Sequence, residues 1–343
     1  MRYVRVRDDW VDYAKAVGII LVVYGHVARG LIKARILEDS RLIMMIDQII
    51  YAFHMPLFFF LSGLFFMQSL ASKGAVGLVR SKLDTVAYPY FVWSLIQGVV
   101  EVSLSRFTNG SLRWSDLIGI AVEPRAQFWF LYALFLLFVC AVFIYRRAGR
   151  GFAACVFVAA AIANLASGLF DEPRIMSYVT VNLVFFAAGV LFSHVAHRSD
   201  LRQSKVEIGL VLLAGCLYAA VYCFYSPEST NVRSIALLLA ISGIGGTVAI
   251  SRLMAKWCPS EKLAQVGQLS MQIYLMHIIA GSGVRVVLSR VLSINDASIH
   301  LVIGTLSGVL VPLVVAVCMR KLGINWLYVP PRQLRLDARR YPL

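Results

Sequence analysis

The chain has 343 residues, of which 59% are hydrophobic and 15% charged, and its mean hydropathy is +0.75. This composition excludes an ordinary soluble globular domain and indicates a polytopic membrane protein. The net charge of +15 could suggest a nucleic-acid partner, but the basic residues lie in short segments between apolar runs, so no nucleic acid is expected to bind.

The first apolar run, residues 14–32, contains two ionisable side chains, Lys15 and His26, which ten residues separate. Such groups are costly inside a membrane helix, so they usually face the bundle interior and mark chemistry or transport. Lys15 could instead extend its ammonium to the interface beside Asp12, one turn earlier. Because the two residues interrupt the run, we expect an uncleaved anchor and not a secretory signal.

Further along the chain, nine more apolar runs approach the length of about 20 residues that a helix needs to cross a bilayer. Six cysteines are scattered without metal-type spacing, so no metal site or disulfide framework is expected. The sequence therefore predicts an all-α bundle of about ten transmembrane helices, near residues 14–32, 43–70, 84–104, 127–145, 151–170, 178–196, 208–226, 233–250, 267–292 and 299–319.

The placement of Lys and Arg predicts the orientation of this bundle. With both termini cytoplasmic, the cytoplasmic segments hold 21 of these residues and the opposite loops hold 11. The positive-inside rule favours this topology. The first outward loop is nevertheless basic, and it is either a solvated loop or a surface that attracts an acidic glycan or anionic lipid headgroup. The domain boundaries follow: a transmembrane domain over residues 1–323 and a short basic cytoplasmic tail over residues 324–343, lying against membrane lipids.

Three histidines in different spans fall at similar depths. At about 1.5 Å per residue, His26 lies about 18 Å from the cytoplasmic face, His54 about 16 Å from the outer face, and His277 about 15 Å from the cytoplasmic face. Each could be an isolated interhelical hydrogen-bonding group. Pro56, two residues after His54, can kink its helix beside a cavity. Contact between the three helices is not fixed by the sequence.

These residue types suit transfer chemistry. A neutral imidazole can act as a general base on a hydroxyl near physiological pH. A cation at the cytoplasmic mouth suits a phosphorylated ligand, so Lys15 could contact a cytosolic donor while His26 acts about 16 Å along the helix.

Four sequence blocks carry a resemblance to a known family. Residues 12–15 read D-Y-A-K and residues 19–26 read I-I-L-V-V-Y-G-H. Residues 53–63 read F-H-M-P-L-F-F-F-L-S-G, residues 128–132 read F-W-F-L-Y, and residues 267–277 read G-Q-L-S-M-Q-I-Y-L-M-H. In this order, the blocks resemble the signatures of the membrane-bound acyltransferase-3 family, the O-acyltransferases of bacterial polysaccharides and related glycans.

The resemblance implies a multi-pass protein of the bacterial cytoplasmic membrane. It would move an acetyl or other short acyl group from cytosolic acyl-CoA, a co-substrate and not a tightly bound cofactor, to a hydroxyl of an exported glycan or lipid-linked sugar. The family's essential basic residue and histidine map onto Lys15 and His26. The oligomeric state is not implied.

A set of roles for the other residues follows as a hypothesis. His26 would be the general base or a transient acyl carrier, and Asp12 would position Lys15. His54 and His277 are second-site candidates, with His277 donating to the carbonyl oxygen as charge develops. Trp129, Tyr132 and Ser62 would line the acyl or sugar pocket, although the two aromatic rings could simply pack in the apolar interior.

One departure concerns acyl-CoA binding. Many family members carry two arginines three residues apart before the third helix, whereas this chain has Arg80 and Lys82. These two residues are candidates for contacts with CoA phosphates, or they are solvated positive-inside residues. A different class of protein also fits the buried histidines: a proton-coupled transporter or flippase, for which paired halves with interrupted helices would be typical. A purely structural membrane subunit is a third reading.

Overall fold

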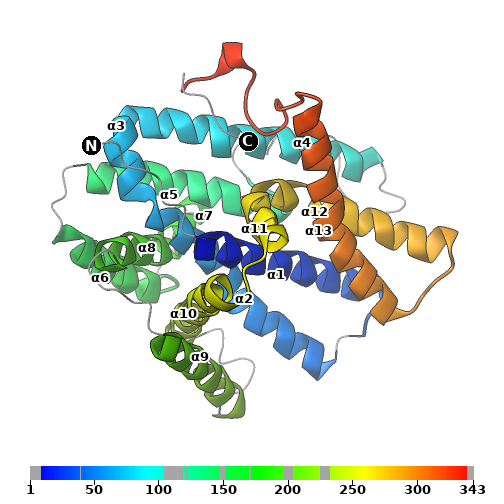
Figure 1. The fold of residues 1–343 in the computed structure, drawn as a ribbon, viewed down its shortest axis with the longest axis horizontal. Helices are drawn as coiled ribbons and strands as arrows, with labels where there is room; N and C mark the ends of the chain where they lie inside the picture. The colour runs from blue at the N-terminus through cyan, green and yellow to red at the C-terminus, as the bar shows by residue number, and fades with distance from the viewer. Residues whose placement is uncertain are drawn as a thin grey trace.

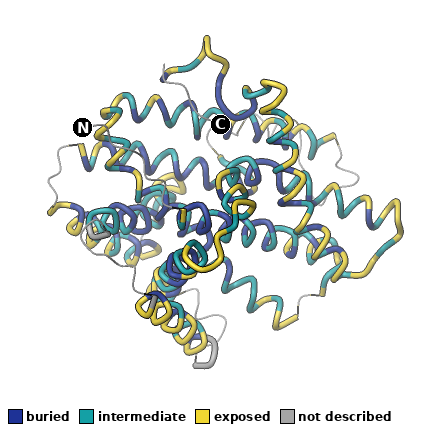
Figure 2. Tube along the Cα trace, viewed as in Figure 1, coloured by how far each residue is buried: buried dark blue, intermediate teal, exposed yellow. Residues whose placement is uncertain are grey.

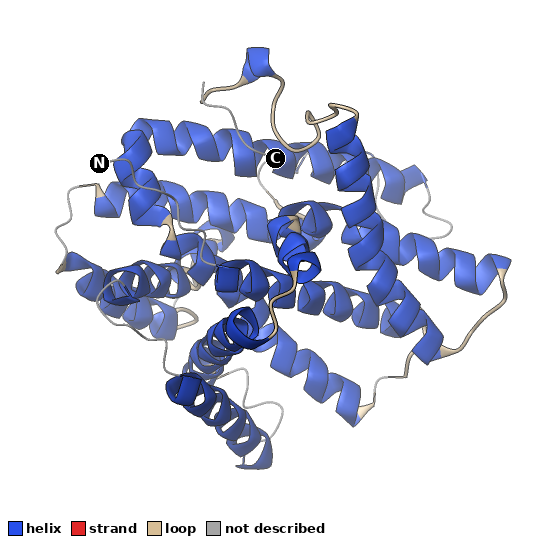
Figure 3. Ribbon diagram, viewed as in Figure 1, coloured by secondary structure: helices blue, strands red, loops and turns tan. Residues whose placement is uncertain are grey.

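The computed structural model describes residues 9–38, 40–103, 114, 119, 123–146, 151–169, 171–196, 204–224 and 232–337. All regular elements in these ranges are helical, as Figures 1 and 3 show. The main helices are α1 (Asp9–Lys33), α2 (Arg41–Leu64), α3 (Phe66–Lys82), α4 (Tyr88–Ser103), α5 (Trp129–Tyr145), α6 (Phe152–Ala166), α7 (Arg174–Thr180), α8 (Leu183–Ala196), α9 (Ser204–Phe224), α10 (Arg233–Trp257), α11 (Glu261–Gln268), α12 (Ser270–Val286) and α13 (Ala297–Lys321).

The prediction of an all-α membrane protein is confirmed, but the predicted count of ten spans is not. Among the described residues, seven helical stretches are long and apolar enough to cross a membrane. Helices α4, α6 and α9 occupy the other three predicted positions and are not among these seven. The cytoplasmic placement of the termini stays a prediction, and residues 1–8 and 338–343 lie outside the described ranges. The seven stretches are Asp9–Lys33, Arg41–Leu64, Ala126–Tyr145, Arg174–His194, Arg233–Trp257, Ser270–Val291 and Ala297–Lys321.

Two predicted boundaries differ from the structure. The span predicted over residues 43–70 ends at Leu64, and a separate helix, α3, begins at Phe66. Within α3, Gly74 has φ 71°, a left-handed conformation that glycine adopts without a Cβ penalty, and it divides the helix at a kink. The span predicted from residue 267 begins at Ser270, because residues 261–268 form the short helix α11. Pro56 does not interrupt α2.

Helix α1 lies in the interior of the molecule and contacts α2, α10, α11, α12 and α13 (Figure 1). Its first turn contains Asp9 and Asp12 and its last turn contains Lys33, which is the charge order that the helix dipole favours. Figure 2 shows α1 mainly buried or half-buried, whereas α9 at the periphery is largely exposed. The bundle is therefore built around the helix that carries Lys15 and His26.

Residues 324–337, at the start of the predicted tail, pack against the helical domain. The indole of Trp93 on α4 stacks on Tyr328, with ring centroids 6.0 Å apart, and its Nε1 donates to the carbonyl of Leu327 at 2.8 Å. The hydroxyl of Tyr88 donates to the carbonyl of Trp326 at 2.7 Å. The described part of this segment is thus docked on α4.

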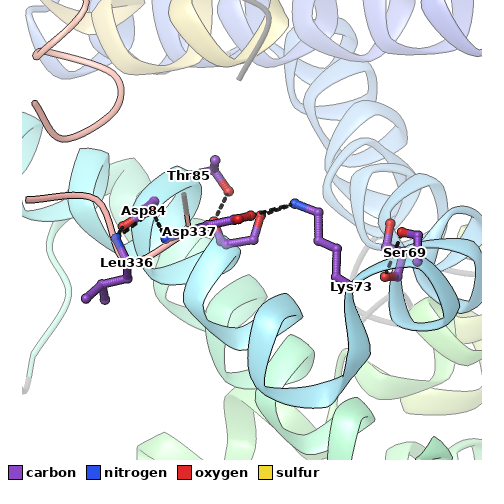
Figure 4. A network of polar contacts seen from close by, with 8 residues as sticks. Ser69, Lys73, Asp84, Thr85, Leu336 and Asp337 are labelled. Atoms are coloured by element: carbon purple, nitrogen blue, oxygen red, sulfur yellow. Dashed lines mark hydrogen bonds and ion pairs between the residues drawn. The ribbon is translucent and has the colours of Figure 1, made fainter. Parts of the chain in front are cut away.

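A polar clasp holds the far end of this segment (Figure 4). The buried carboxylate of Asp84 accepts the backbone N–H groups of Leu336 and Asp337, the latter at 2.9 Å. The carboxylate of Asp337 in turn pairs with Lys73 of α3 at 3.1 Å. The C-terminal segment is therefore held by α3, through Lys73, and by the short helical segment Leu83–Ala87 before α4, through Asp84.

Candidate active site

Helix α1 positions three of the predicted site residues at two levels. Asp12 and Lys15 lie in its first two turns, and His26 lies about 16 Å further along its axis. Asp12 is buried, and Lys15 and His26 are half-buried. One rigid helix therefore holds a cationic group near one end and an imidazole near the other.

The structure brings the three histidines of similar predicted depth together. The ring centroids of His26 on α1 and His277 on α12 are 5.1 Å apart. The ring of Tyr51 on α2 lies 6.5 Å from that of His26 and 4.6 Å from that of His54. We call His26, His54, His277 and Tyr51 the histidine cluster.

Backbone contacts fix the ring orientation of two of these histidines. Nδ1 of His54 lies 2.7 Å from the carbonyl oxygen of Ile50, and Nδ1 of His277 lies 2.7 Å from that of Tyr274. Because a carbonyl oxygen only accepts, Nδ1 carries the proton in each ring, and Nε2 of the neutral ring is an acceptor. Neutral His277 therefore cannot donate from Nε2 to a developing oxyanion, and its geometry suits an acceptor role in place of the predicted donor role.

A cavity of about 30 Å³ lies between the later halves of α1 and α12 and the start of α13. This volume has room for about two water molecules. His26, His277 and His300 line it, together with Ser282 and Arg285. The imidazole of His26 thus borders a space that a small polar group can occupy.

An ion pair between Arg29 and Asp47 lies beside the histidine cluster. Arg29 donates two hydrogen bonds to the carboxylate of Asp47, from Nε at 2.9 Å and from Nη2 at 2.7 Å. Its guanidinium also lies 3.1 Å from the ring centroid of Tyr51. Paired to Asp47 and stacked on Tyr51, Arg29 holds the aromatic ring that lies between His26 and His54.

At the other end of α1, the first and last sequence blocks meet. Nε2 of Gln268 on α11 donates to Oδ2 of Asp12 at 3.4 Å. Gly267 packs against the backbone of Asp12 so closely that an added Cβ would lie 2.6 Å from its carbonyl carbon. Only a residue without a side chain allows this approach, so Gly267 sets the position of α11 against Asp12 and, one turn on, Lys15.

Of the two candidate phosphate-binding residues, only Lys82 lies near Lys15. Burial, and then the positive charges of Lys73 and Lys15, lower the pKa of Lys82 to about 8. Its ammonium also lies 3.9 Å from the ring centroid of Phe138. Arg80 is exposed on the same helix. The structure thus gathers Lys15, Lys73 and Lys82 at one end of α1 and leaves Arg80 facing outward.

The predicted pocket residues Trp129, Tyr132 and Ser62 do not line the cavity beside His26. Trp129 stacks on Tyr178 of α7, with ring centroids 6.2 Å apart, and Tyr132 contacts Tyr178 at 5.9 Å. The hydroxyl of Ser62 donates within α2 to the carbonyl of Phe58 at 2.8 Å. The two aromatic residues therefore belong to a separate ring cluster, and their pocket role stays a prediction.

Three residues around the histidines were not identified from the sequence: Tyr51, Arg285 and His300. Arg285 could have been found, because it falls within a predicted apolar span and a charge there is costly. His300 carries the same signal, because it falls within the span predicted over residues 299–319. Tyr51 carries none, since its role depends on which helices meet. Among the described residues, no group of three His, Cys, Asp or Glu side chains is arranged to hold a metal ion.

Comparison with known protein families supports the resemblance that the four sequence blocks carry. The family described as an acyltransferase domain matches residues 8–317, which include all four blocks and the whole histidine cluster. The chain belongs to the acyltransferase-3 family. The recognition made from the motifs is thereby confirmed, and the protein is a multi-pass membrane acyltransferase.

Two relatives of this acyltransferase are each named nodulation protein NolL. The protein of Sinorhizobium fredii (strain NBRC 101917 / NGR234) is 22% identical over 293 residues, covering 79% of this chain and 77% of the relative. The protein of Mesorhizobium japonicum (strain LMG 29417 / CECT 9101 / MAFF 303099) is 22% identical over 361 residues, covering 97% and 93%. No solved structure matches the acyltransferase.

Proposed function

We propose that this acyltransferase transfers an acetyl or other short acyl group from cytosolic acyl-CoA to a hydroxyl of a cell-surface or exported glycan, in the bacterial cytoplasmic membrane. The observation that carries the proposal is the place of His26. It borders a small cavity beside His277, on the same helix that presents Lys15 about 16 Å away. A donor-binding end and a reacting end are thus joined by α1.

The donor end is suited to the phosphates of CoA. Lys15 and Lys82 bring two ammonium groups near one another, and Lys73 adds a third charge that is shared with Asp337. Like charges gathered at a partly buried site repel each other, and an anionic ligand relieves that repulsion. In the predicted topology this end of α1 faces the cytoplasm, where acyl-CoA is made. Arg80, which is exposed, is outside this phosphate site.

The reacting end is suited to general-base catalysis. His26 accepts the proton of the sugar hydroxyl while the hydroxyl oxygen attacks the thioester carbonyl carbon. The tetrahedral intermediate collapses, the C–S bond breaks, and the proton passes from His26 to the departing CoA thiolate. The products are the O-acyl sugar and free CoA. His54 and Tyr51 pack behind His26 and keep its ring in place.

Acetyl transfer by the purified protein tests this proposal. Labelled acetyl-CoA is incubated with the protein in detergent and with a mixture of bacterial glycans, and label in the glycan is counted. We expect His26→Ala to lower the transfer rate by about 10²- to 10⁴-fold, the usual contribution of a general base.

His194→Ala is the matched control, because His194 is a half-buried histidine at the end of α8 with its Nδ1 2.9 Å from the Val190 carbonyl. It should transfer label at the wild-type rate. The proposal fails if label never leaves CoA in the wild type while His26→Ala changes glycan flux across vesicles, which would make the protein a carrier.

A further inference from the structure

Arg285 is a charged residue whose setting the transfer chemistry does not explain. It lies within the apolar stretch Ser270–Val291, is half-buried, and lines the cavity that His26 borders. Its Nη1 donates to the carbonyl of Gly30 at 3.2 Å. Among the described residues no carboxylate pairs with it. A guanidinium has five N–H donors, so most of them remain for a ligand.

No acidic residue is among the described residues that line the cavity, and Asp47 and Asp296, on the neighbouring helix α2 and at the start of α13, already have partners. Asp47 accepts hydrogen bonds from Nε and Nη2 of Arg29. Asp296 caps α13, accepting the backbone N–H of Ile299 at 2.8 Å. A cation in a membrane span is costly without a counter-charge. The cavity therefore has an uncompensated positive charge on one wall.

Two other residues that line the same cavity, His277 and His300, each have an unused hydrogen-bond acceptor. His300 has Nε2 2.8 Å from the carbonyl of Ile294, so its Nδ1 is the acceptor of the neutral ring. Nδ1 of His300 and Nε2 of His277 are both buried without a hydrogen-bond partner, and each residue is 1% exposed. Buried polar atoms without partners are rare and need an explanation. A ligand with two hydrogen-bond donors would therefore satisfy these two nitrogens.

A sugar that carries an acidic group supplies what these three residues lack. Its hydroxyls donate to the two imidazole lone pairs, and its anionic oxygens accept from the guanidinium in the paired geometry that arginine forms with carboxylates. A neutral sugar would satisfy the imidazoles and leave the charge of Arg285 unmatched. An anionic lipid headgroup without hydroxyls would pair with Arg285 and leave the two imidazole nitrogens without donors.

We propose that the acceptor of this acyltransferase is an acidic sugar, held by Arg285 through its anionic group and by His277 and His300 through its hydroxyls. The inference rests on the proposed function, because it assigns the cavity to the acceptor. At about 30 Å³ the cavity admits the reacting edge of the sugar, and the ring stays at the mouth. Gly30 lines this cavity, and two exposed cations, Lys33 and Arg35, follow it in the sequence at the end of α1 and just after it.

Binding of matched sugars tests the inference without requiring transfer. The probes are methyl β-glucuronoside, methyl β-glucoside and the 6-sulfate of the glucoside, added to the full-length protein in detergent while its thermal unfolding is followed. We expect the two anionic probes to raise the Tm and to bind about tenfold or more tightly than the neutral one, as for a charge-assisted pair. The stronger of the two anionic probes identifies a carboxylate or a sulfate-like group.

The variant Arg285→Gln keeps a donor for the Gly30 carbonyl and removes the charge, so it should bind all three probes equally weakly. Arg290→Gln, an exposed cation five residues further on, should behave as the wild type. The inference is overturned if no anionic probe binds the wild type more tightly than the glucoside. It is also overturned if Arg285→Gln binds the anionic probes as well as the wild type does.

The two proposals fail in different ways. Loss of the transfer chemistry would appear as label that never reaches a glycan and as His26→Ala without effect, with the probe binding intact. Loss of the acidic-acceptor inference would appear as transfer to neutral glycans that Arg285→Gln leaves unchanged.

Discussion

Replacing Gly267 by alanine tests whether the two ends of the sequence hold the donor site together. A Cβ at this position would lie 2.6 Å from the carbonyl carbon and 3.0 Å from the Cα of Asp12. Carbon atoms in contact stand about 3.5–4.0 Å apart, and the Asp12 carbonyl oxygen would lie closer to the Cβ than either carbon, so α11 and α1 must separate by at least about 1 Å. Backbone atoms lie on both sides of this contact and no side chain can turn away.

The expected result of Gly267→Ala is a large loss of activity with a modest loss of stability. A displacement of about 1 Å in a catalytic arrangement can cost roughly 100-fold in rate. Overpacking of a buried contact typically costs about 1–3 kcal/mol in the free energy of unfolding. The measurements are kcat/KM for labelled acetyl transfer and the Tm of the protein in detergent.

The matched control is Gly283→Ala on α12. Gly283 is exposed, helical, and has no atom within 4 Å of the added Cβ. Alanine is the better helix former by about 1 kcal/mol, so this variant should keep full activity and equal or higher stability. If Gly267→Ala retained wild-type kcat/KM and Tm, the close approach of α11 to Asp12 would not shape the site, and the reasoning would be refuted.

Three further predictions concern the helices around the site. Asp84→Asn weakens the charge-assisted hydrogen bonds to the C-terminal segment, by about 1.5–3 kcal/mol, and should expose residues 324–337 to limited proteolysis. Gly63→Ala places a Cβ 2.9 Å from the Phe186 carbonyl carbon and should lower the Tm, whereas Gly209→Ala, with open space around it, should not. The KM for acetyl-CoA should rise as pH increases through about 8, because the Lys82 ammonium then loses its proton; Lys82→Arg should flatten this profile.

The features that follow from local sequence were predictable. Apolar runs of bilayer length gave the helical membrane fold, and residue spacing gave the similar depth of His26, His54 and His277. Their mutual contact was not predictable, because depth along an axis says nothing about which helix faces are in register around it. The ring contact of 5.1 Å between His26 and His277 required the packing of α12 on α1.

The misplaced boundaries have a common cause. Hydropathy predicts a helix where apolar residues accumulate, so the span predicted over residues 43–70 runs past Leu64 into α3, and the remaining, more polar part of α3 falls in no predicted span. The docking of residues 324–337 was missed for a similar reason. Its contacts with Trp93 and Asp84 join segments more than 200 residues apart, and nothing in the local composition of a basic, proline-bearing tail signals them.

The placement of glycines explains why one late segment controls both ends of α1. At the donor end, Gly267 admits the backbone of Asp12. At the reacting end, Gly304 and Gly308 on α13 face Val27 and Val23, the neighbours of His26 along α1, and a Cβ at either position would come within 2.9 Å of a valine methyl. Helices α11 to α13 thus fix the position of α1 at both levels through contacts that tolerate no side chain. A shift of this segment would move the donor site and the histidine cluster together, so coupling between acyl-CoA binding and acceptor binding is expected to pass through it.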